Sequence, residues 1–102
     1  MELRQLEYFQ MVSRLKNITR AAHRLRVSQP NITVAIKKLE SELGVQLLDR
    51  SQKQLSLTPE GTVFLKRIEV ALRNIKDAVL EVNDYKQLQR GTIKIGIPPM
   101  MG

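Results

Sequence analysis

The 102-residue sequence has no cysteine, no tryptophan and only four aromatic residues. The lack of cysteine excludes disulfides, thiolate metal sites and a cysteine nucleophile, and it is compatible with a reducing compartment. No apolar run approaches the roughly 20 residues that a membrane-spanning helix needs. The charged N-terminal stretch MELRQLEYF lacks the apolar segment of a signal peptide. We therefore expect a soluble, cytoplasmic protein that does not bind a membrane.

Residues that carry catalytic or metal chemistry are equally scarce. His23 is the only histidine, and it has no acidic cluster at ligand spacing around it. We therefore expect neither a metal site nor a catalytic residue. The sequence also lacks a Gly-rich phosphate loop and a Ser/His/Asp arrangement. These absences argue against an enzyme, and we expect no cofactor for these residues.

Positive charge, in contrast, is abundant and unevenly placed. The formal net charge is +7. Residues 1–57 hold 10 Lys/Arg against 5 Asp/Glu, or +5, whereas residues 58–102 hold 7 against 5, or +2. A basic domain of this size usually has a polyanionic partner, either nucleic acid or an anionic membrane surface.

Residues 17–44 contain two short amphipathic helical patterns separated by Arg26-Val27-Ser28. Asn17 is suited to cap the first helix and Ser28 the second, while Gly44 supplies a stop. On the second helix, from Gln29 to about Leu43, one face is apolar and the opposite face is polar and basic. Two such helices joined by a short turn predict a helix-turn-helix whose second helix enters a DNA major groove. The apolar face consists of Ile32, Ile36, Leu39 and Leu43.

The flanking segments fit around this motif. Helical spacing predicts a first helix from about Leu3 to Leu15, and alternation with a polar tip predicts a small hairpin from Val45 to Leu57. A hairpin directly after a helix-turn-helix is a wing. Thr58-Pro59-Glu60 then opens a long helix. Its apolar stripe has little else in the chain to cover it, which predicts a two-fold dimer. The predicted dimer-interface residues are Phe64, Ile68, Ala71, Ile75, Ala78 and Val82.

The expected fold is mostly α: a winged helix-turn-helix of three helices and a two-stranded wing, followed by a long dimerisation helix. The DNA-binding domain is expected over residues 1–58, with the helix-turn-helix at about 18–37 and the wing at about 46–57. The dimerisation helix is expected over 59–90. Residues 92–97 have a strand pattern, but the sequence offers no partner strand for them. We therefore expect residues 91–102 to be the start of a further, truncated domain.

Five segments, in order and at fixed spacing, resemble the LysR-type transcriptional regulator family. They are LRQLEYF at 3–9, AAHRLRVSQPNIT at 21–33, KKLESELGVQLLDRS at 37–51, LTPEG at 57–61 and GTIKIGI at 91–97. The resemblance implies regulation of bacterial promoters, a dimerising linker helix with antiparallel partners, and commonly tetramers. It also implies a C-terminal domain that binds a small-molecule co-inducer. The sequence departs from the commoner family pattern at Asn31, Val34 and Ala35, which leaves open which bases are read.

Several side chains are candidates for contact with duplex DNA. Gln29 and Asn31 could bond adenine, and Val34 could pack on a thymine methyl group. Lys37 has the length to reach a phosphate, and Lys53 stands where the family often places a minor-groove arginine. For the polar and basic residues, a solvated surface is the plainer alternative, and for Val34 it is an unremarkable exposed apolar residue. The full set of candidates is Arg20, Ser28, Gln29, Pro30, Asn31, Thr33, Val34, Lys37, Arg50, Gln52 and Lys53, with Arg24 and Arg26 as further possible phosphate contacts.

Two other classes of function compete with this interpretation. In the first, the long helix is a coiled-coil adaptor and the positive charge only aids solubility, but the wing and the capped second helix argue against it. In the second, the protein binds RNA, as its basic character would allow. The sequence has few of the exposed aromatics on which unpaired bases stack. We therefore predict sequence-specific binding of double-stranded DNA by a dimer on an inverted repeat.

Overall fold

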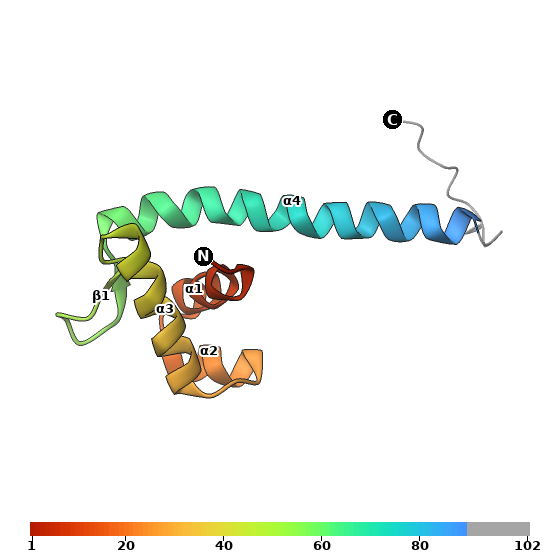
Figure 1. Cartoon of the computed structure of the whole chain (residues 1–102). Coiled ribbons are helices and arrows are strands. Elements are labelled where there is room, and N and C mark those ends of the chain that lie inside the picture. The colour runs from red at the N-terminus through yellow and green to blue at the C-terminus, as the bar shows by residue number, and fades with distance from the viewer. Residues whose placement is uncertain (90–102) are drawn as a thin grey trace. The chain divides into compact units, whose positions relative to one another are not determined.

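The computed structural model describes residues 1–89 and divides into two units, Met1–Leu72 and a second that begins at Arg73. The residues predicted to form a strand at 92–97 and a further domain over 91–102 lie outside the described part. The mostly helical fold with a two-stranded antiparallel sheet is confirmed (Figure 1). Its elements are α1 (Leu3–Leu15), α2 (Ile18–Leu25), α3 (Gln29–Leu43), β1 (Leu48–Asp49), β2 (Ser56–Leu57) and α4 (Pro59–Gln89).

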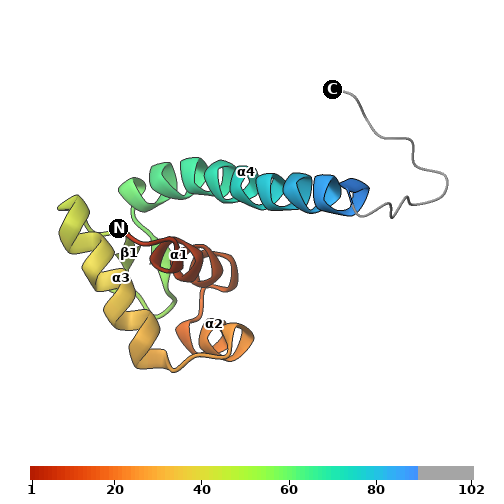
Figure 2. The same ribbon diagram turned by 45° about the vertical axis from the view of Figure 1, so that its right-hand side comes forward.

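The first three helices pack against one another in pairs around one core (Figures 1 and 2). Small side chains on α2 let this helix approach its neighbours closely, since Ala21 is fully buried and Ala22 nearly so. The apolar face predicted for α3 points into this core. The buried core residues are Tyr8, Phe9, Val12, Ala21, Ala22, Ile32, Ile36, Leu39, Leu47, Leu48 and Ile68.

Side-chain caps set the starts of three helices where the sequence predicted them. Asn17 Oδ1 accepts a hydrogen bond from the Arg20 amide at 2.9 Å, and Ser28 Oγ accepts one from the Asn31 amide at 3.3 Å. Thr58 Oγ1 accepts one from the Gly61 amide at 2.9 Å. These bonds satisfy amides that have no partner inside their own helix.

The backbone conformations that end the first two helices were not predicted. Lys16 after α1 and Arg26 after α2 both adopt left-handed backbone conformations, with φ of 52° and 60°. Glycine is the usual residue at such a position because a Cβ atom is unfavourable there. Gly44 after α3 follows this rule, at φ 75°.

The wing is present but its paired part is short. Leu48 pairs with Leu57 and Asp49 with Ser56 in antiparallel register. Beyond this pairing, the amide and hydroxyl of Ser51 donate to Asp49 Oδ1 at 2.9 and 2.5 Å. These two hydrogen bonds lower the pKa of the Asp49 carboxyl, because they favour its charged form. The carboxylate thus closes the turn at which the chain leaves β1.

The start of α4 packs against residues 46 and 47, which lead into β1. The Thr58 amide donates to the Leu47 carbonyl at 3.1 Å, and the Thr58 hydroxyl donates to the Gln46 carbonyl at 2.6 Å. Gly61 is buried at this contact, and a Cβ atom built on it would lie 2.1 Å from the Leu47 carbonyl oxygen. Only glycine fits this approach of a helix to a backbone carbonyl.

The first turns of α4 belong to the compact unit, which extends to Leu72. Ile68 is 5% exposed, and the ring of Phe64 lies 5.8 Å, centroid to centroid, from that of Phe9 on α1. The expectation that the apolar stripe is uncovered is therefore wrong at these two positions. Their side chains complete the core of their own chain, which leaves Ile68 unavailable to a partner.

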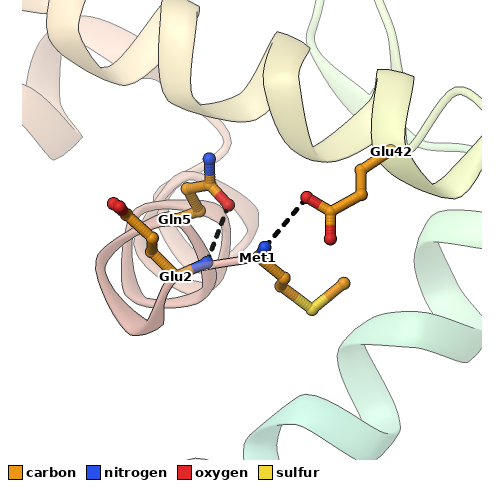
Figure 3. Close-up of polar contacts among 4 residues, drawn as sticks. All are labelled: Met1, Glu2, Gln5 and Glu42. Atoms are coloured by element: carbon orange, nitrogen blue, oxygen red, sulfur yellow. Dashed lines mark hydrogen bonds and ion pairs between the residues drawn. The ribbon is translucent and has the colours of Figure 1, made fainter.

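Two ion pairs join further elements of the compact unit at its surface. The Met1 amine lies 2.9 Å from a carboxylate oxygen of Glu42 on α3, and the Glu2 amide donates to Gln5 Oε1 at 3.0 Å (Figure 3). Arg14 on α1 lies 3.8 Å from Glu69 on α4. Exposed pairs of this kind each stabilise a fold by about 0–1 kcal/mol, so the apolar core dominates.

The contact at Gly61 generates a stability prediction. Gly61→Ala forces a methyl group against a backbone carbonyl and should lower the free energy of unfolding by about 1–3 kcal/mol. Urea denaturation followed by circular dichroism measures this change. Val63→Ala, a truncation at an exposed site half a turn away, should change stability by less than about 0.5 kcal/mol. Equal midpoints for wild type and Gly61→Ala would contradict the close approach.

Candidate nucleic-acid interface

The outward face of α3 carries five of the eleven side chains predicted to contact DNA. Burial of Ile32, Ile36 and Leu39 fixes the rotation of the helix about its axis. Thr33 is half-buried at the edge of this face, so it is less accessible than the other predicted residues on the helix. The exposed residues of α3 are Gln29, Pro30, Asn31, Val34, Lys37, Lys38, Ser41 and Glu42.

The N-terminal turn of α3 presents both polar side chains and the positive end of the helix dipole. Ser28 Oγ caps the Asn31 amide, so capping accounts for this predicted contact residue without DNA. Gln29 and Pro30 occupy the first turn and are exposed. A glutamine at this place can extend along the helix axis toward a base edge.

Val34 is an apolar residue in the middle of this outward face. It is 50% exposed and does not belong to the core or to the residues packed against it. A β-branched side chain at an exposed helix position has no advantage for the helix itself. Its surroundings therefore allow contact with an apolar group of a ligand, such as a thymine methyl.

The wing brings a second group of cations next to α3. Arg50, Gln52 and Lys53 are all exposed. Arg50 and Lys37 line the same hollow, of about 430 Å³, between the C-terminal half of α3 and the approach to the wing. The sequence placed these two cations on separate elements, and the structure shows that they border one concave surface. The other lining residues are Glu40, Ser41, Gly44, Val45 and Gln46.

Glu40 holds the wing against α3, and sequence reasoning missed it. It is 6% exposed, and its Oε2 accepts hydrogen bonds from the Leu47 amide at 2.7 Å and the Leu48 amide at 3.2 Å. A buried carboxylate persists only when donors satisfy it. The available signal was its spacing, because Glu40 follows Ile32 and Ile36 at intervals of four residues and so falls on the buried side of α3.

The sequence from α1 to the middle of α3 carries charge of one sign. Residues 8–39 contain seven Lys/Arg and no Asp or Glu. Arg20, Arg24 and Arg26 are exposed on and just after α2, and none of them forms an ion pair within residues 1–89. Unpaired guanidinium groups attract phosphate oxygens, which they bind in a bidentate manner. The surface therefore suits a polyanion.

Between residues 1 and 89 there is no group of three or more His, Cys, Asp or Glu side chains placed to hold a metal ion. No helix of that same range is long and apolar enough to span a membrane.

Apolar side chains also lie exposed on α4 beyond the compact unit. Ile75 is 45% exposed and Val82 65% exposed, and both belong to the predicted dimer interface. Ala71 and Ala78 of the same predicted set are exposed as well. Val79, Leu80, Tyr85 and Leu88 add further exposed apolar surface to this helix.

Together, these features define a winged helix-turn-helix DNA-binding domain. Comparison with known protein families agrees, since the family described as bacterial regulatory helix-turn-helix protein, lysR family, matches residues 3–62. The chain therefore belongs to the LysR family of bacterial transcriptional regulators, as the sequence resemblance predicted.

Curated relatives and solved structures support the same assignment. The chain is 45% identical over 97 residues to the HTH-type transcriptional regulator BsdA of Bacillus subtilis, covering 94% of this chain and 33% of that protein. The DNA-binding domain of BenM in complex with catB site 1 DNA is similar, with a TM-score of 0.80 and 38% identity, over 82% of this chain and 93% of that chain. DarR of Vibrio fischeri in complex with DNA has a TM-score of 0.79 and 32% identity, over 86% and 30% of the two chains.

These comparisons establish a DNA-binding function for this chain, and the relatives that they give are transcriptional regulators. The chain spans about a third of the length of the curated relatives that it matches.

Proposed function

We propose that this chain binds duplex DNA with α3 in the major groove and the wing at the adjacent minor groove, as a homodimer on an inverted repeat. In the whole protein, a further domain would bind a small-molecule co-inducer and so regulate transcription from bacterial promoters. The whole protein would assemble as a tetramer. The observation that carries the DNA-binding geometry is the hollow shared by Lys37 and Arg50. It places cations of the recognition helix and of the wing around one surface.

The division of roles follows from side-chain chemistry. Gln29, Asn31 and Val34 are uncharged and exposed on the outward face of α3, so they are suited to read base edges. Lys37, Arg50 and Lys53 are cations, which supply affinity through phosphates without reading sequence. Gln52 at the wing tip completes the surface that would meet the minor groove.

Gln29 provides the test of base reading. Gln29→Ala should weaken binding to the selected site by about 1–3 kcal/mol and relax the preference at one base pair in each half-site. Binding to random duplex should hardly change, because no charge is removed. Selection of sites from a random pool with both proteins measures this. An unchanged motif in the variant would transfer the reading role to Asn31 or Val34.

Lys37 provides the test of phosphate contact. Lys37→Ala should weaken binding to selected and random duplexes almost equally and reduce the slope of log affinity against log salt concentration by about 1. Fluorescence anisotropy across a salt series measures both quantities. Lys66→Ala removes the same charge from an exposed position on α4 and should leave the slope unchanged. A loss confined to the selected site would instead make Lys37 a base reader.

The homodimer is proposed on the exposed apolar side chains of α4, among them Ile75 and Val82. Ile75→Glu would place a charge in the dimer contact and should give monomers. Asn74→Glu, which adds the same charge at the neighbouring exposed position, should leave the dimer intact. Sedimentation velocity at micromolar concentration distinguishes the two species. A wild-type chain that is already monomeric there would contradict the proposal.

A further inference from the structure

The long helix α4 carries a second regular row of side chains besides the predicted dimer interface. From Val63 to Gln87 its members alternate at intervals of three and four residues, which places them on one face of the helix. By the same helical spacing, this face points away from the side on which Gly61 and Ile68 are buried. We call it the outer stripe. Its members are Val63, Lys66, Val70, Arg73, Asp77, Leu80, Asp84 and Gln87.

The chain itself does not cover the outer stripe. Val70 and Leu80 are 49% and 53% exposed, and the other members are exposed apart from the half-buried Gln87. Arg73 and Asp77 lie one helical turn apart, but neither of the ion pairs within residues 1–89 involves them or any other member of the stripe. Both the apolar groups and the charges of this face are therefore available to a partner.

The charges of the outer stripe are divided by sign along the helix. Lys66 and Arg73 precede residue 75, whereas Asp77 and Asp84 follow it. A second copy that paired in parallel would place each of these residues opposite itself, which gives four like-charge contacts. Such contacts are destabilising, so the stripe discriminates against a parallel partner.

An antiparallel copy meets a complementary surface instead. When the two-fold axis is level with residue 75, a residue a given number of places before that level faces the residue as many places after it. Each basic member then faces an acidic one, and each valine faces leucine or glutamine. The facing pairs, each formed twice, are Arg73 with Asp77, Lys66 with Asp84, Val70 with Leu80, and Val63 with Gln87.

We propose that the outer stripe binds a second copy of this chain in antiparallel orientation about residue 75. The apolar pairs supply attraction, and the ion pairs set direction and register, since exposed ion pairs contribute little net affinity. Ile75 and Val82 of the predicted dimer interface lie on another side of α4 by helical spacing. The contact is therefore additional to that interface and would join one dimer to the next. It goes beyond the proposed DNA binding and does not depend on it.

Cross-linking tests the direction of the pairing, because the chain has no cysteine of its own. Val70→Cys and Leu80→Cys each introduce one thiol on the outer stripe. In the antiparallel pair, the two copies of either position lie ten residues apart along the axis, about 15 Å. With a bis-maleimide that spans less than this, an equimolar mixture of the two variants should link and neither variant alone should do so. Links within a single variant, or none in the mixture, would overturn the proposal.

Charge reversal tests the register in the same assay. In both cysteine variants, Arg73→Glu turns two attractive contacts into repulsive ones and should weaken the association about tenfold, which lowers the linked fraction. Arg73→Glu with Asp77→Arg restores opposite charges at both contacts and should recover the linked fraction. Lys76→Glu makes the same change of charge at an exposed position outside the stripe and should have little effect. Equal losses for Arg73→Glu and Lys76→Glu would contradict the register.

Ile75→Glu separates this contact from the proposed dimer interface. The mixture of cysteine variants should still link when both chains carry Ile75→Glu, since residue 75 lies on another side of the helix. Loss of the link in this background, with helix content unchanged by circular dichroism, would overturn the outer stripe as an additional contact.

Discussion

The carboxylate of Glu40 is the interaction on which the geometry of the DNA-binding surface depends. This buried carboxylate accepts hydrogen bonds from the Leu47 and Leu48 amides at 2.7 and 3.2 Å. These bonds fix the start of the wing against the C-terminal half of α3. Because a buried charge left without donors is costly, the chain cannot separate these elements without a large loss of stability. Lys37 and Arg50 border one hollow as a result.

The same short segment also holds the beginning of α4. The Leu47 carbonyl accepts a hydrogen bond from the Thr58 amide, and Gly61 lies against the same carbonyl. Residues 46–48 thus form hydrogen bonds with two parts of the fold, α3 through Glu40 and the start of α4 through Thr58. The apolar core supplies most of the stability by burying surface, whereas these polar bonds select one arrangement of the elements among those that the core would tolerate.

Much of the fold was predictable because its signals are local. The helix bounds from Leu3 to Leu15 and from Gln29 to Leu43 follow from apolar spacing and from caps such as Ser28. The outward face of α3 follows from the same spacing. The roles of Phe64 and Ile68 did not follow, because both continue the stripe of α4 while packing into the core of their own chain. Periodicity shows that a face is apolar, but it does not show what covers it.

The remaining errors and omissions have a common physical origin. Glu40 is a polar residue whose partners are backbone amides seven and eight positions along the chain, and no side-chain pattern marks those partners. The left-handed conformations of Lys16 and Arg26 were unexpected because residue preference favours glycine there. Arg20, Arg24 and Arg26 line one hollow, and this shared surface depends on the geometry of the turn after α2. Each of these features arises from tertiary structure rather than from composition or period.

The tip of the wing, residues 52–54, makes none of the hydrogen bonds that hold the wing to the rest of the domain. Residues 52–54 take part in none of the bonds that join Glu40, Leu47, Thr58 and Gly61, and Asp49 closes the turn before them with its own local bonds to Ser51. The bonds that hold the wing and the exposed side chains of Gln52 and Lys53 therefore occupy different residues of one short hairpin. Substitutions and changes of length at the tip should therefore leave the bonds of Glu40, Leu47 and Thr58 intact, so the sequence of this loop can vary without a loss of the arrangement that those bonds hold.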